Sequence, residues 1–431
     1  MTRSTMLALL LLAAAPLSQA QSPALPDAGA SDAQKLGWMQ GFPPAADKTV
    51  RFDNGSFYSF PRLRWSFNHY REIVPTKTVS RGDGKVQAFA SAPRDLDGVQ
   101  FTTMDGRAMN FAEALQNTYA DGVVVLHRGR IVYEKYFSEG RAERPHLAMS
   151  VTKSFVGTLA ATLAVQGKLD PAAPITQYIP ELKDSAYGDA TVRQLMDMTV
   201  GVQYSENYAD PKAEVFDYAR AGGMLPAAPT YAGPRSFYDF LVTLKKEGEH
   251  GQAFAYKTAN AEVLAWVVKR ASGKSLADLM SEQIWSKLGV EQDAYFQIDR
   301  IGSESGGGGL NTTLRDLARF GEMMRNDGRA NGQQVIPAAV VQDIRKGGDP
   351  AHFAKAGMST LAGFSYRNMW WVSGNAHGMF MARGIHGQTI YIDPKAEVVI
   401  VRYASHPIAG NAANDPVTLP AFAAVANSLM K

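Results

Sequence analysis

The sequence contains no cysteine among its 431 residues. This absence excludes disulfide bonds, catalytic thiolates and metal sites built on thiolate ligands. The eight histidines are scattered, with neither a His-Glu-x-x-His motif nor a close pair of histidines. We therefore expect no metal site in this protein.

The chain also lacks an excess of charge of one sign, because it has 44 Lys and Arg residues and 41 Asp and Glu residues, for a formal net charge of +3. The basic residues form no stripe, so we expect no nucleic-acid partner. After the first twenty residues no apolar stretch approaches the length of a transmembrane helix, so we expect no membrane span.

One apolar run does occur, at residues 6–17, after the positively charged Arg3 and before the small residues Ser18 and Ala20. This pattern predicts a signal peptide over residues 1–20, cleaved after Ala20, and a periplasmic or secreted protein. The remaining 431 − 20 = 411 residues suffice for one large domain or two closely packed ones.

Composition and periodicity divide the rest of the chain. We predict a linker over residues 21–48 with one short helix near 33–39, then an N-terminal arm over 49–108 that packs its aromatic side chains on the main body. The β-rich runs 122–126 and 131–137 predict a hairpin, and four further strands follow at 369–372, 379–383, 388–392 and 397–403. Residues 109–168 and 290–431 thus form a sheet domain. Residues 169–289 form an inserted, mostly helical domain with a long loop at 205–235.

Ser150 and Lys153 lie three residues apart at the start of a predicted helix, so their side chains share one face. No other charged residue follows until Lys168, which indicates that the helix is buried on every side. Burial lowers the pKa of a lysine toward neutrality, and a neutral amine can take a proton from a neighbouring hydroxyl. Context therefore favours a catalytic role for this pair over a structural one.

Two further segments are candidates for the same site. Tyr256 precedes an amphipathic helix expected from Ala261, and Thr258 follows it two places later. Taken without the Ser-x-x-Lys pair, Tyr256 is more simply a core tyrosine. Beside the ammonium of that pair, the phenolate form of Tyr256 would be favoured. Gly387 allows a close backbone approach, so the N–H of Gln388 could join that of Ser150 as a second donor to a carbonyl oxygen; a plain turn between strands is the alternative.

The glycine-rich run 302–309 precedes another predicted helix. It lacks the Gly-Lys-Ser/Thr ending of a phosphate-binding loop, so we expect no nucleotide. Two interpretations stay open, a flexible turn and a loop shaped to line a site.

In this order, the Ser-x-x-Lys, Tyr-x-Thr and Ile-His-Gly segments resemble the motifs of the serine β-lactamase and penicillin-binding-protein superfamily. Over residues 108–431 the chain looks most like the class C-type branch, which includes esterases and 6-aminohexanoate-dimer hydrolases. Residues 64–76 are similar to the N-terminal arm of the latter group. The resemblance implies an α/β (α+β) fold with a β-lactamase-like antiparallel sheet flanked by helices.

The resemblance also implies roles for residues. Ser150 would be the nucleophile, Lys153 its activating partner, and Tyr256 the general base and acid. Thr258 falls at the asparagine of a Tyr-x-Asn motif, and Ile385-His386-Gly387 falls at a Lys-Thr-Gly motif. Losing that lysine removes a cation for a substrate carboxylate, which disfavours β-lactam and D-Ala-D-Ala substrates.

Tyr204, Tyr208 and Asp210 lie where the resemblance implies contacts to a free amine of the substrate, with a solvated loop as the alternative. The function predicted is an exported serine hydrolase that cleaves a small-molecule amide or ester through an acyl-enzyme on Ser150, without a cofactor. The alternatives are a β-lactamase or D,D-peptidase, and a binding protein or sensor that captures a ligand without turnover. The natural substrate and the oligomeric state stay open.

Overall fold

A computed structural model describes residues 26–431; the predicted signal peptide lies outside the described residues, as does the first part of the predicted linker. The main sheet has eight strands in the order β12-β13-β14-β15-β16-β5-β6-β2. All neighbours are antiparallel except β2 and β6. In that order the strands are Ser365–Arg367, Trp370–Val372, Phe380–Gly384, Gln388–Asp393, Val398–Ala404, Ala120–His127, Arg130–Tyr136 and Ala90–Ser91.

Three smaller sheets accompany it. A four-stranded sheet has the order β1-β8-β9-β7, and two-stranded sheets pair β3 with β4 and β10 with β11. The strands of the four-stranded sheet are, in that order, Thr76–Val79, Ala294–Gln297, Leu310–Thr312 and His146–Leu147. The two pairs are Gln100–Thr102 with Ala108–Asn110 and Arg329–Ala330 with Gln333–Gln334.

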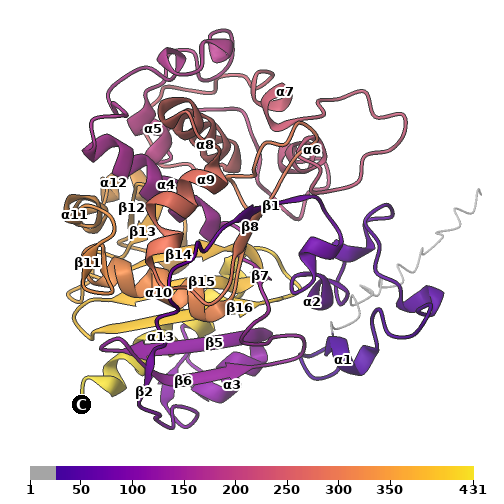
Figure 1. Ribbon diagram of the computed structural model, residues 1–431, viewed down its shortest axis with the longest axis vertical. Coiled ribbons are helices and arrows are strands. Elements are labelled where there is room, and N and C mark those ends of the chain that lie inside the picture. Colours follow the sequence, from indigo (N-terminus) through magenta and orange to yellow (C-terminus); the bar gives the residue numbers. More distant parts are fainter. Residues whose placement is uncertain (1–25) are drawn as a thin grey trace, which may run out of the picture.

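Helices cover both faces of the main sheet (Figure 1). Helix α10 (Leu314–Arg325) packs on β5, β15 and β16, and α4 (Val151–Val165) on β14, while α13 (Asp415–Leu429) and α3 (Phe111–Asn117) lie together on the opposite face. The other α-helices are α1 Ala33–Leu36, α2 Leu63–Ser66, α5 Val192–Met196, α6 Glu214–Ala221, α7 Phe237–Leu241, α8 Thr258–Ser272, α9 Leu276–Gln283, α11 Ala338–Lys346 and α12 Pro350–Ala354. The predicted fold class is confirmed.

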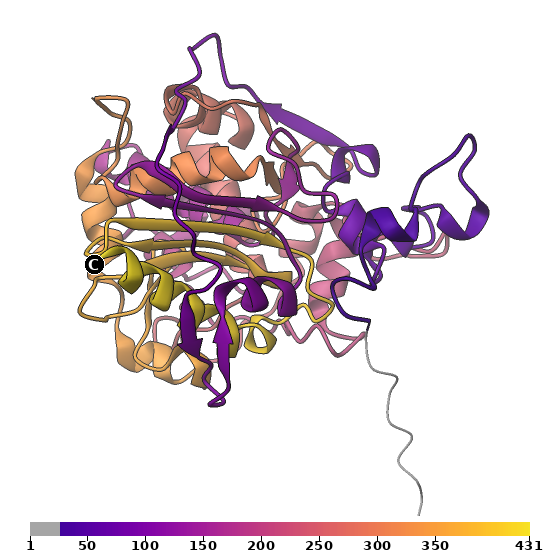
Figure 2. The same ribbon diagram turned by 90° about the horizontal axis from the view of Figure 1, so that it is seen from below.

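Helix α4 is buried on every side, as its sequence predicts. Residues Val151 through Leu163 are all buried, and α8 packs along α4. Figure 2 shows the main sheet nearly edge-on with helices above and below it. Among residues 26–431, no helix is long and apolar enough to cross a bilayer.

The arm packs on the main body through its aromatic residues. Phe57, Trp65, Phe67 and Tyr70 form a buried cluster with Leu147 and Met149, which lie three and one positions before Ser150. Arm residues also supply β1, which pairs with β8, and β2 at the edge of the main sheet. The arm therefore reaches the neighbourhood of the predicted nucleophile.

One expectation about the 205–235 loop is wrong, because α6 forms inside it. Val215, Tyr218 and Ala221 recur every three residues and give this short helix a buried face. The Glu214 carboxylate at its start accepts a hydrogen bond of 2.8 Å from the N–H of Ser205, which closes the preceding loop on the helix. Flanking Pro and Gly residues obscured this eight-residue pattern in the sequence.

Candidate active site

Ser150 occupies the N-cap position of α4 and is almost fully buried. The residue before it, Met149, has a φ of +50°, a left-handed conformation that is strained for this side chain. One helical turn later, Lys153 donates hydrogen bonds from Nζ to Ser150 Oγ at 2.8 Å and to the Gly307 carbonyl at 2.5 Å. The strained turn and the helix thus fix the hydroxyl against the amine.

The Lys153 side chain is 1% exposed. Burial lowers the pKa of Lys153 to about 8, although the carboxylates of Glu206 and Glu262 oppose the shift. A substantial fraction of this amine is therefore neutral near pH 8. Such an amine can accept the proton of the hydroxyl that it contacts.

Tyr256 lies two residues before α8, with its ring on Trp371 at a centroid distance of 5.3 Å. Lys153 Nζ lies 5.1 Å from the Tyr256 ring centroid. The expectation that its phenolate is favoured is wrong: burial and the charge of Glu206 raise the pKa of Tyr256, and contacts with Ser150 and Arg383 offset this only in part. Tyr256 therefore stays a neutral phenol, suited to donate a proton.

The glycine-rich run lines the site rather than forming a free turn. The N–H groups of Gly306 and Gly307 donate to the Glu262 carboxylate, each at 3.0 Å, and the Gly307 carbonyl accepts from Lys153. A Cβ on Gly306 would lie 2.3 Å from Ala265 Cβ, and one on Gly307 2.6 Å from Thr258 Cγ2. Glycine is required because α8 approaches so closely.

At the C-terminal strand pair it is Gly384, not Gly387, that meets the nucleophile. A Cβ on Gly384 would lie 2.9 Å from Ser150 N and 2.8 Å from Ala148 O. Gly387 instead faces Arg402, whose Nη1 would lie 3.0 Å from its Cβ. Ile385, which follows Gly384, lines both cavities beside Ser150.

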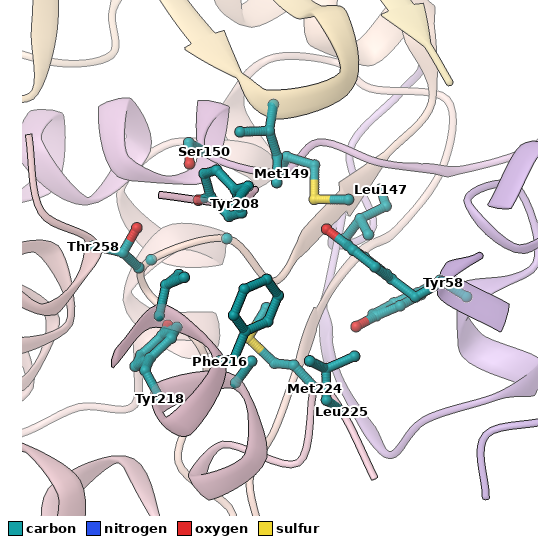
Figure 3. A pocket seen from close by; sticks show the side chains of 16 residues that line it. Tyr58, Leu147, Met149, Ser150, Tyr208, Phe216, Tyr218, Met224, Leu225 and Thr258 are labelled. Carbon is teal, nitrogen blue, oxygen red and sulfur yellow. The ribbon is translucent and has the colours of Figure 1, made fainter. Parts of the chain in front are cut away.

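Two cavities meet at Ser150. The first, which we call the apolar cavity, is lined by Tyr58, Tyr70, Leu147, Met149, Ser150, Tyr208, Val215, Phe216, Tyr218, Ala219, Met224, Leu225, Thr258, Gly307, Gly308 and Ile385. Figure 3 shows the Ser150 hydroxyl at one end of this space and Phe216, Met224 and Leu225 at the other. The drawn side chains end in carbon, sulfur or hydroxyl oxygen.

The second, which we call the polar cavity, contains charged groups. Ser150, Tyr256, Glu206 and Arg383 line it together with Trp371, Asp415 and the 357–361 and 410–412 segments. Arg383 donates to the Asp415 carboxylate, and its guanidinium lies 5.1 Å from the Trp371 ring centroid. A nucleophile between an apolar and a polar cavity can act on a substrate with two chemically different ends.

The sequence pattern of the beta-lactamase family matches residues 110–419. The chain belongs to the beta-lactamase family. This confirms the resemblance noted from the motifs, and with the buried serine and lysine it makes the protein a serine hydrolase.

Two 6-aminohexanoate-dimer hydrolase relatives and a class C beta-lactamase are similar to this chain. The 6-aminohexanoate-dimer hydrolase of Paenarthrobacter ureafaciens is 36% identical over 368 residues, which are 85% of this chain and 91% of the relative. A solved 6-aminohexanoate-dimer hydrolase homologue from Bacillus anthracis has a TM-score of 0.81 and 34% identity, covering 90% of this chain and 99% of its own. A class C beta-lactamase from Rhodobacter sphaeroides, at 15% identity and a TM-score of 0.52, covers 73% of this chain and 97% of its own and shares the fold.

In this beta-lactamase-family hydrolase, Gln388 lines neither cavity beside Ser150, so its position gives no support to the predicted role of its N–H as a donor to the reacting carbonyl. The Gln388 side chain is buried and binds backbone, donating to the carbonyls of Ile385 at 3.2 Å and Ala404 at 2.6 Å. His386 is buried edge-on against the Tyr58 and Phe67 rings, and burial lowers the pKa of His386 to about 4. These residues support the turn from behind and line neither cavity beside Ser150.

The loop residues predicted to contact substrate divide in two. Tyr208 lines both cavities, and its hydroxyl donates to Glu206 at 2.7 Å. Asp210 is exposed and accepts only a local bond of 2.9 Å from the N–H of Lys212. Tyr204 is buried against Phe240 and lines neither cavity. The implied contacts of Tyr204 and Asp210 to a substrate amine therefore stay predictions, to which their positions in this structure give no support.

Thr258 lies in the site, but its polar groups are hydrogen-bonded to Glu206 and do not point freely into a cavity. Its N–H and Oγ1 donate to the two Glu206 carboxylate oxygens at 2.6 and 2.7 Å. Sequence reasoning missed Glu206 because the contact spans 52 positions. It also missed Glu262, whose signal was a lone charged residue in α8 before Lys269.

Proposed function

We propose that the protein cleaves a small-molecule amide or ester through an acyl-enzyme on Ser150. The observation that carries the proposal is the buried Lys153 amine 2.8 Å from Ser150 Oγ, with a pKa lowered to about 8 by burial. In the first step Ser150 Oγ bonds to the substrate carbonyl carbon while its proton passes to neutral Lys153. Lys153 is therefore the base, as its burial in the sequence suggests, and not Tyr256, to which the family resemblance assigned that role.

The carbonyl oxygen gains negative charge in this step. We assign its stabilisation to the N–H of Ser150, at the N-terminus of α4, and the N–H of Ile385. The support is the close approach of Gly384 to Ser150 N and the position of Ile385 in both cavities. This replaces the Gln388 N–H of the sequence-based prediction.

Tyr256 is the proton donor to the leaving group in the proposed mechanism. The carbon–nitrogen or carbon–oxygen bond breaks as the Tyr256 hydroxyl protonates the departing atom, and the proton held by Lys153 restores the phenol. A water then attacks the acyl carbon and gives a proton to the same pair. The bond between the acyl carbon and Ser150 Oγ breaks, the pair returns the proton to Oγ, and the acid product leaves. A raised pKa of Tyr256 suits this donor role because the hydroxyl keeps its proton until the bond breaks.

A chromogenic ester tests the proposal. Mass spectrometry of the wild type with a p-nitrophenyl ester should detect a covalent acyl adduct, and Ser150→Ala should abolish both this adduct and hydrolysis of the ester. Ser154→Ala is the matched control, since Ser154 lies in the same buried helix but donates only to the Met369 carbonyl. Equal rates for Ser150→Ala and wild type would refute the nucleophile, and stoichiometric labelling without turnover would favour a sensor.

A second candidate, β-lactam hydrolysis, is favoured by one observation. The lysine of the Lys-Thr-Gly motif is absent, but another cation, Arg383, lines the polar cavity directly before Gly384. A guanidinium can receive a carboxylate such as that of a β-lactam, but here Asp415 already occupies it. We expect linear amides and esters to react faster than nitrocefin; faster nitrocefin hydrolysis would reverse the ranking.

We also propose that the protein is exported to the periplasm or beyond, on the strength of the charged, apolar and small-residue segments of residues 1–20. Expression of the full chain should yield a mature protein whose N-terminus is Gln21. An intact N-terminus on cytoplasmic protein would overturn this proposal.

A further inference from the structure

The position of Tyr256 decides which cavity holds which end of the substrate. A proton donor must lie within hydrogen-bond reach of the departing atom. Tyr256 lines the polar cavity and not the apolar one. Since both cavities include Ser150, the leaving group lies on the polar side and the acyl chain on the apolar side.

The apolar cavity offers nothing to balance a charge. In the part of the chain that the structure describes, no Lys, Arg, Asp, Glu or His side chain lines it. Its walls are aliphatic, aromatic or thioether groups with a few hydroxyls (Figure 3). An ammonium placed there would lose its water without gaining a carboxylate partner.

The carboxylates behind this wall are already occupied. Glu206 accepts from Thr258 N–H, Thr258 Oγ1 and the Tyr208 hydroxyl. Glu262 accepts from the N–H groups of Gly306 and Gly307 and from the Tyr218 hydroxyl at 2.8 Å. The two tyrosine protons are thus directed at these acids, and neither acid is free to pair with an amine in the cavity.

We infer that the substrate's acyl part is an uncharged apolar chain, bound in the cavity that ends at Phe216, Met224 and Leu225. Such a chain differs from the ω-amino acyl group implied by the name of the Paenarthrobacter relative. The inference rests on the proposed acyl-enzyme at Ser150 and specifies which acyl groups form it. Apolar burial supplies the binding energy, and an unpaired terminal charge opposes it.

Two esters of equal length test the inference on the wild-type protein. p-Nitrophenyl heptanoate and p-nitrophenyl 6-aminohexanoate share a leaving group and differ only in a terminal methyl against an ammonium. We expect kcat/KM to favour the heptanoate by about tenfold or more. Equal values, or a preference for the amine, would overturn the inference, whereas no Ser150-dependent turnover of either ester would overturn the proposed function instead.

A pair of variants tests the cavity itself. Met224 lines it, is partly exposed, and has a side chain similar in length to Glu and Gln. Met224→Glu should shift the heptanoate to 6-aminohexanoate ratio toward the amine by about tenfold or more, because it supplies the missing partner. Met224→Gln should leave the ratio within about threefold of wild type. An unchanged ratio in a folded Met224→Glu protein would place the acyl chain elsewhere.

Discussion

Replacing Gly384 by alanine should separate catalysis from stability. Gly384 has a φ of −132° and a ψ of 152°, an extended backbone that alanine adopts without strain. The added Cβ would lie 2.8 Å from Ala148 O and 2.9 Å from both Met149 Cβ and Ser150 N. Two of these three atoms are backbone, so the two segments must move apart.

The displacement acts at the two proposed oxyanion donors. Overpacking of this kind costs about 1–3 kcal/mol in the free energy of unfolding. Misplacing one oxyanion donor lowers kcat by about 10²–10³-fold. We therefore expect Gly384→Ala to fold, with kcat for a p-nitrophenyl ester reduced about a hundredfold or more.

Gly387→Ala is the matched control three positions later. Its φ of +97° makes alanine strained, at about 1–3 kcal/mol, but its nearest neighbours would be Arg402 and Ala404 and not Ser150. The two variants should lose similar stability in urea unfolding, while only Gly384→Ala loses kcat. The reverse pattern, with catalysis lost in Gly387→Ala and kept in Gly384→Ala, would refute our placement of the oxyanion donors.

Three further predictions follow from charges near the site. An amine must be neutral to accept a proton, so kcat should rise with pH through the lowered pKa of Lys153, about 8, and then level off. Glu262→Gln removes an anion that raises the pKa of Lys153, so the pH–rate profile of this variant should rise at lower pH than that of the wild type. A midpoint that is unmoved or higher would contradict this prediction. Asp415→Asn leaves the Arg383 charge buried without its partner and should destabilise the protein by about 3–5 kcal/mol in urea unfolding; a loss below about 1 kcal/mol would show that the pair is solvated. Asp210→Ala should change the unfolding equilibrium constant and kcat/KM by less than about twofold each, because the side chain is exposed and makes only a local hydrogen bond. A large loss of kcat/KM would show that Asp210 contacts the substrate.

The sequence predicted those features that depend on short spacing. Ser150 and Lys153 meet because they lie three positions apart at the start of a helix, and no partner elsewhere in the chain is needed for that contact. The strands β5, β6, β15 and β16 were predicted because runs of β-branched residues end at turn residues. Local patterns of this kind survive without knowledge of the tertiary structure.

The features that were missed depend on contacts distant in sequence. Gly384 and Gly387 both fit the closing glycine of the Lys-Thr-Gly motif, because that glycine is all that the sequence retains of it. The two are distinguished only by the structure, in which Gly384 and not Gly387 lies against Ser150 N. Tyr58 and Tyr70 read as packing residues of the arm, yet both line the apolar cavity. Glu206 lay unnoticed in a polar loop because its partner Thr258 begins a distant helix.

The packing of the arm also bears on how the molecule assembles. Arg64 Nε donates to Ser405 Oγ across 341 positions, and Tyr58 lies edge-on against His386 at 5.7 Å. Closing so large a loop is slow compared with forming α4 or the β5–β6 hairpin. We therefore expect the contacts that fix Tyr58 against the C-terminal strands to form late in folding, so that Ser150 and Lys153 come together before the compartment that selects their substrate is complete.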